Sequence, residues 1–195
     1  LSASFNQVYL VKYLGMSYTE VSACSLITSA LQLLVFYRFW GRFNDMMGAG
    51  LTLQLSIGLY AVESMCWVLA GEGSVRLIYP LICVILGVET PAFSISMFSR
   101  RYEIIPEEGR AVYDTFFSCA VGVVLLVSPL LGELLRGWAA GLPLPAENFW
   151  GYRLIYLLSA VLLLALFAGG LLQYQREKRL GGRKVGSFLW NLLRP

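Results

Sequence analysis

Apolar residues along this chain come in long blocks that contain little polar alternation. A helix of about 20 residues spans a hydrocarbon layer of roughly 30 Å, whereas a surface helix of a soluble protein keeps one polar face. The blocks predict six membrane-spanning helices and a basic tail, over residues 1–14, 19–39, 49–70, 75–98, 112–135, 151–173 and 174–195. The predicted fold class is therefore all-α, a polytopic membrane helix bundle.

Short segments rich in glycine or charge separate the blocks. We expect a turn at Gly15 to Tyr18, with Thr19 as the N-cap of the second helix, and a second turn at Gly71 to Ser74. Three loops are expected over residues 40–48, 99–111 and 136–150. The first block is short for a crossing, and we expect it to be the end of a helix that begins upstream.

Composition narrows the function classes. Of the 195 residues, 57% are hydrophobic and only 14% are charged, against about 25% in a soluble domain. Histidine is absent, which excludes histidine-based catalysis and histidine metal sites. The four cysteines lie inside apolar blocks without C-x-x-C spacing, so we expect buried small side chains rather than metal ligands. No phosphate-binding loop occurs. We expect no cofactor and no enzymatic activity.

The basic residues are distributed unevenly when loops are assigned to alternate sides. One side holds eleven of the 15 lysines and arginines and the other holds four. Because positive residues stay cytoplasmic, the tail and both charged loops are predicted to face the cytoplasm. We expect an integral protein of the bacterial inner membrane with a cytoplasmic C-terminus.

The connection between the second and third blocks carries a specific pattern. Gly41, Asp45 and Gly48 match the spacing of a Gly-x-x-x-Asp-Arg-x-Gly loop. The connection thus resembles the loop that joins the second and third helices of each six-helix half in the major facilitator superfamily. Met46 stands where that family has Arg or Lys, and Ala49 and Gly50 replace its basic pair.

The resemblance implies a fold and a function. The chain would be one half of a twelve-helix secondary transporter that moves a small solute by alternating access, with ion coupling such as H⁺. Residues 128–133, Ser-Pro-Leu-Leu-Gly-Glu, look like a worn copy of a helix signature of family antiporters. Both worn patterns favour the second half, so the other six helices would be the partner, together with the solute and the lipid bilayer.

Glu89 is the main candidate for the site. It lies near the middle of the fourth block, directly before Thr90 and Pro91. Burial disfavours the charged form of a carboxyl group, so an acid at this depth suits reversible protonation. A structural acid that never changes state is the alternative. Glu63 lies in the third block, where we expect lipid contact with snorkelling or a bond to another helix.

Polar residues recur along the second block at helical spacing, at Ser22, Ser25, Ser29 and Gln32. Such a face either bonds neighbouring helices or lines a wet cavity. In the resembled family the first, second, fourth and fifth helices of a half face the cavity, while the third and sixth face lipid. Further cavity candidates are then Asn6, Gln7 and Phe116.

The loop over 99–111 holds acids and bases in balance. The resemblance implies an inner gate in which Asp45 pairs with Arg100 or Arg110, and a solvated loop is the alternative. Two other functions compete with transport. An intramembrane enzyme would need a nucleophile–base pair or a metal cluster, whereas the spans hold no histidine and only two mid-span acids, on separate helices. A non-transporting scaffold or assembly subunit is the other alternative.

Overall fold

A computed structural model describes residues 6–71, 73–140 and 150–180, and these residues are almost entirely helical. The elements are α1 (Asn6–Val8), the π-helical η2 (Tyr9–Tyr13), α2 (Tyr18–Leu31), the π-helical η3 (Gln32–Phe36), α3 (Tyr37–Met47), α4 (Ala49–Leu69), α5 (Val75–Ile104), α6 (Arg110–Ala140) and α7 (Trp150–Leu180). The predicted all-helical class is confirmed.

Within the described residues, five helices are long and apolar enough to cross a membrane, by length and composition. They cover Tyr18–Met47, Ala49–Leu69, Val75–Ile104, Arg110–Trp138 and Gly151–Leu172. The predicted count of six is therefore not reached. The first block contributes only α1 and η2, which together are too short to cross.

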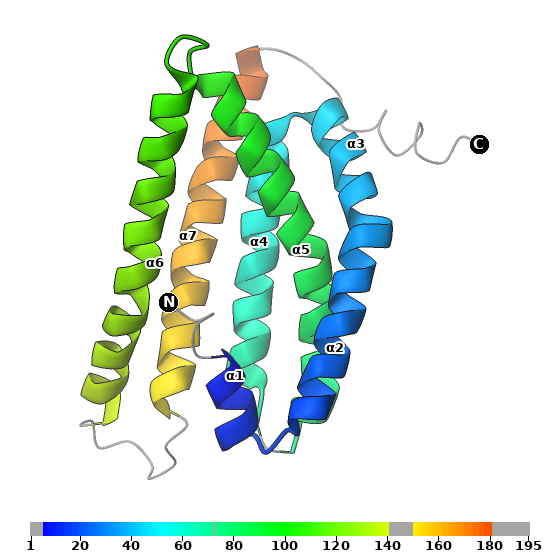
Figure 1. The fold of residues 1–195 in the computed structure, drawn as a ribbon, viewed down its shortest axis with the longest axis vertical. Helices are drawn as coiled ribbons and strands as arrows, with labels where there is room; N and C mark the ends of the chain where they lie inside the picture. The colour runs from blue at the N-terminus through cyan, green and yellow to red at the C-terminus, as the bar shows by residue number, and fades with distance from the viewer. Residues whose placement is uncertain (1–5, 72, 141–149, 181–195) are drawn as a thin grey trace.

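The long helices lie beside one another in the order α6, α7, α4, α5, α2 (Figure 1). α4 packs against both α5 and α7, while α2 packs against α5 and α6 against α7. The turns from α3 to α4 and from α5 to α6 lie at one end of the bundle, which we call the basic end (Figure 1). Its described positions include Arg38, Arg42, Arg100, Arg101 and Arg110.

Two of the predicted loops are mostly helix. α3 continues through residues 40–47 because Trp40, Phe43 and Asn44 lie on one buried face at helical spacing. Only Gly48 turns the chain, with a φ of 88° that disfavours any residue with a side chain. Similarly, α5 runs to Ile104 and α6 begins at Arg110. The prediction of a loop over 40–48 was wrong, and that over 99–111 was too long.

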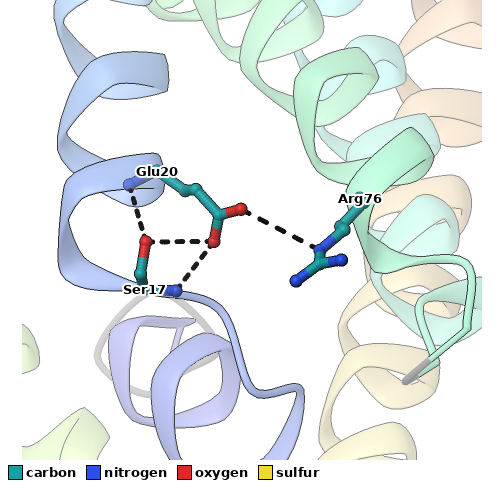
Figure 2. A network of polar contacts seen from close by, with 3 residues as sticks. All are labelled: Ser17, Glu20 and Arg76. Atoms are coloured by element: carbon teal, nitrogen blue, oxygen red, sulfur yellow. Dashed lines mark hydrogen bonds and ion pairs between the residues drawn. The ribbon is translucent and has the colours of Figure 1, made fainter.

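The second helix begins earlier than expected. Ser17, not Thr19, is the N-cap, and its hydroxyl accepts a hydrogen bond from the Glu20 backbone N–H at 3.2 Å. The Glu20 carboxylate accepts the Ser17 backbone N–H at 2.9 Å, which completes a capping box (Figure 2). Arg76 of α5 lies 3.9 Å from the same carboxylate, so the cap also joins the starts of α2 and α5.

Aromatic side chains fill the core at the end opposite the basic end. The rings of Trp67 on α4 and Tyr156 on α7 stack with centroids 5.4 Å apart. Tyr9 of η2 is fully buried among them and donates its hydroxyl to the Ala70 carbonyl at 3.2 Å. The residues before α2 are thus held against α4 and α7 although they form no complete span.

Candidate functional site

Glu89 is enclosed by protein in the middle of α5. Its side chain is 0% exposed, and both carboxylate oxygens lack a hydrogen-bond partner. None of the ion pairs among the described residues involves it. An ionised carboxylate without a partner is costly in such surroundings, which makes this the most unusual polar group of the bundle.

Pro91 lies inside α5, which continues as one helix through it. Proline has no backbone N–H, so the carbonyl four residues earlier, that of Gly87, loses its helical donor. Gly87 faces α2, since a Cβ added there would lie 3.8 Å from the Thr28 carbonyl oxygen, in ordinary van der Waals contact. The helix therefore lacks one backbone hydrogen bond, and meets α2, next to its buried acid.

A second buried acid, Glu63, lies on α4. It is only 7% exposed, and its Oε1 accepts a hydrogen bond from Trp67 Nε1 at 2.5 Å. The expectation that Glu63 meets lipid is wrong, because α4 packs between α5 and α7 instead of lying at the edge of the bundle. The bond it makes is within its own helix, one turn along.

The two acids are close enough to interact electrostatically across the α4–α5 contact. Tyr60 of α4 lies beside Thr90 of α5 and within the range of electrostatic interaction with Glu89. On the α7 side, Tyr156 lies within the same range of Glu63. Two carboxyl groups are therefore gathered with neutral hydroxyls in the interior of the bundle.

The polar face predicted on the second helix divides into two sets. Gln32 Nε2 donates to the Leu86 carbonyl at 3.3 Å, and Thr28 Oγ1 donates to the Cys83 carbonyl at 3.1 Å. Ser25 and Ser29 are exposed and bond carbonyls of their own helix, and Ser25 also lies within hydrogen-bond reach of Tyr79 on α5. Thr28 and Gln32 join α2 to α5 shortly before Pro91, where η3 begins.

The remaining cavity candidates lie apart from Glu89. Asn6 Oδ1 accepts a hydrogen bond from the Tyr156 hydroxyl at 2.7 Å, which places Asn6 in the aromatic core. Gln7 is exposed. Phe116 on α6 is 76% exposed, outside the buried interior that holds the two acids.

At the basic end the charged residues pair locally. Arg100 pairs with Glu103 at 3.0 Å, and Arg101 of α5 pairs with Asp114 of α6. Arg110 lies 4.8 Å from the centroid of the Tyr102 ring. Among the described residues Asp45 enters no ion pair, so the expected link from Asp45 to Arg100 or Arg110 is not formed in this structure.

Gly41 and Gly48 of the same predicted loop differ in backbone conformation. Gly41 is an ordinary residue inside α3, while Gly48 makes the turn with positive φ. Asn44 ties α3 to α5 by donating to Ser99 Oγ at 3.0 Å. The pattern that resembles a family loop is thus built here from a helix end and one glycine.

Residue patterns alone missed three members of the site, Thr28, Tyr60 and Glu63. Thr28 lies four residues before Gln32, so helical spacing from Gln32 is a signal that could have found it. Glu63 was identified from the sequence but expected to face lipid, since a helix without a distinct polar face gives no sign of which side is buried.

Comparisons with family models, with curated proteins and with solved structures found no match to this chain.

Proposed function

We propose that this chain is part of a secondary transporter in which Glu89 exchanges a proton as a small solute crosses the membrane. One observation carries the proposal: a fully buried carboxyl group without a partner, inside a helix long and apolar enough to span a bilayer. Acids kept at such positions despite their cost are typical of proton relays and solute pathways.

The surroundings of Glu89 support movement as well as protonation. Pro91, two residues later, removes one backbone hydrogen bond from α5 without ending the helix, and a helix bends most easily at such a position. Thr28 and Gln32 hold α2 to α5 at the same level. A change in the charge of Glu89 would act on a helix that already lacks a backbone hydrogen bond at Pro91.

The proposal extends to the topology and the missing partner. The chain would serve as one six-helix half of a major-facilitator-type protein, working with a second half and with its basic end toward the cytoplasm. The uncovered apolar sides of α2 and α6 support this reading, because the windows that span the membrane are only 11% and 6% buried within the chain.

The test is transport by the full-length protein in liposomes. Solutes are screened for accumulation driven by an imposed pH gradient, and the active one is then followed in the Glu89→Gln variant. We expect gradient-driven accumulation to fall at least tenfold in Glu89→Gln, because the amide cannot take up or release a proton. Glu103→Gln removes an acid at the exposed basic end and should keep wild-type accumulation.

Two results would contradict the proposal. One is the absence of gradient-driven accumulation for every class of solute by the wild-type protein. The other is accumulation by Glu89→Gln at the wild-type rate, which would remove the assigned role of this acid.

A further inference from the structure

We propose that Glu63 and Glu89 act as one proton-binding pair, whose two carboxyl groups share protons and do not both carry charge while α4 and α5 are packed. The inference rests on the proposed function and deepens it, because it names the second group of the same site. It also gives a role to an acid that the mechanism built on Glu89 alone does not use.

Burial and proximity are the first support. The two side chains are 0% and 7% exposed and come from neighbouring helices. The rings of Tyr60 and Phe93 pack across the same contact with centroids 5.7 Å apart, about one helical turn from Glu63 and from Glu89. Two like charges in a medium of low dielectric constant repel strongly and both lose their hydration. The doubly charged state is therefore the least favourable state of the pair.

The absence of a compensating cation is the second support. The groups that face the pair are neutral: Tyr60, Cys66 and Trp67 on α4, Thr90 on α5 and Tyr156 on α7. A basic residue of α7, Arg153, lies against Tyr9 on the far side of the aromatic core. Within the described residues no arginine or lysine is ion-paired with either acid. No group of three or more cysteine or acidic ligands able to hold a metal ion occurs there either. A proton is then the simplest means of neutralising the pair.

The hydrogen bonds make the pair unequal. Glu63 accepts the Trp67 N–H, and a donor of this kind stabilises negative charge on a carboxylate. Glu89 has no donor at either oxygen. We therefore place the shared proton on Glu89, with Glu63 as the group that carries the charge when one is present.

The experiment uses a hydrophobic carbodiimide on the full-length protein in membranes. This reagent adds to a protonated carboxyl group and leaves a stable adduct, whose position and yield are read by mass spectrometry as pH is varied. No solute is needed. A protein without transport can still show the pairing, and a transporter can lack it, so the two proposals fail separately.

In Glu63→Gln we expect the midpoint of labelling at Glu89 to move to lower pH by about one unit, because removal of the neighbouring charge makes Glu89 easier to ionise. The amide oxygen of the new side chain can still accept the Trp67 N–H, so folding is preserved. Glu89→Gln should leave the midpoint of Glu63 close to its wild-type value, because Glu63 loses its proton while Glu89 is still protonated and neutral. Glu63→Asp keeps the pair and Glu103→Gln leaves it untouched, so both should keep the wild-type midpoint at Glu89.

Three results would overturn the inference. The first is a Glu89 midpoint that is the same in Glu63→Gln and in wild type. The second is a wild-type labelling midpoint that is higher at Glu63 than at Glu89, which would place the shared proton on the other group. The third is protection of both acids by sodium ions at fixed pH, which would assign the pair to a metal cation instead of a proton.

Discussion

Gly48 makes the turn between α3 and α4 with a φ of 88°, while Gly41, seven residues earlier, is an ordinary helical residue. An added Cβ would meet nothing within 4 Å at either position. The two glycines therefore differ in backbone conformation and not in available space, which makes them a matched pair for substitution.

We expect Gly48→Ala to lower the free energy of unfolding by about 1–3 kcal/mol, because its φ of 88° and ψ of 153° lie in a region that essentially only glycine adopts. Gly41→Ala should leave stability unchanged or raise it by up to about 1 kcal/mol, since alanine favours helix. Reversible unfolding of the purified protein in mixed micelles measures both. Equal effects of the two substitutions would contradict the assigned turn.

At this scale the sequence was informative about Glu89 and less so about Glu63. Depth within a long apolar block singles out an acid, since few residues of that kind are tolerated there. The sequence does not show, however, whether such a side chain points into the bundle or away from it. α4 contains buried Thr52, Ser56 and Ser64 as well as Glu63, so its buried face is no more apolar than its outer one. Amphipathic patterning could not separate the faces.

The contact between α2 and α5 depends on two side-chain bonds to backbone carbonyls. Thr28 and Gln32 reach Cys83 and Leu86, just before the close approach at Gly87. Ser29, on the same helix, bonds only its own backbone and is exposed. The helix pair is therefore held by one side of α2, at the level where η3 begins.

Thr28→Val should destabilise the folded protein by about 0.6 kcal/mol, the average for a hydrogen bond between membrane helices. Gln32→Leu should have an effect of similar size. Ser29→Ala is the control and should stay within about 0.5 kcal/mol of wild type. The same unfolding assay applies, and a loss in Ser29→Ala as large as in Thr28→Val would show that the contact is wrongly assigned.

Helix ends show where sequence patterns stop being sufficient. Charged and glycine-containing segments marked the turns near Gly48, Gly71 and Gly109 correctly. They also predicted loops where α3 and α5 continue as helix, because arginine and asparagine mark the end of an apolar block but not the end of the helix. A helix of 30 residues is about 45 Å long, more than the roughly 30 Å of hydrocarbon, so helix length and span length need not agree.

As a whole, the chain is a row of helices whose interior is best covered at α4 and α5 and least covered at α2 and α6. Blocks of apolar residues were enough to predict the five long helices and which turns share an end of the bundle, but they predicted one span too many for the described residues. They could not give the neighbours of each helix, which depend on packing between distant residues. The position of α4 between α5 and α7, which buries Glu63, is the main example.

The central claim is that the buried position 89 is reached by water from one side of the membrane at a time. The direct measurement is the reaction of Glu89→Cys with a membrane-impermeant thiol reagent, in a full-length protein whose Cys24, Cys66, Cys83 and Cys119 are replaced by serine or alanine. Leu162→Cys, on the exposed apolar side of α7, is the matched control for a lipid-facing position.

The account predicts that the cysteine at 89 reacts with reagent added to either side of the membrane, while the cysteine at 162 stays unreactive from both sides. A cysteine at 89 that is as unreactive as the one at 162 from both sides would contradict it.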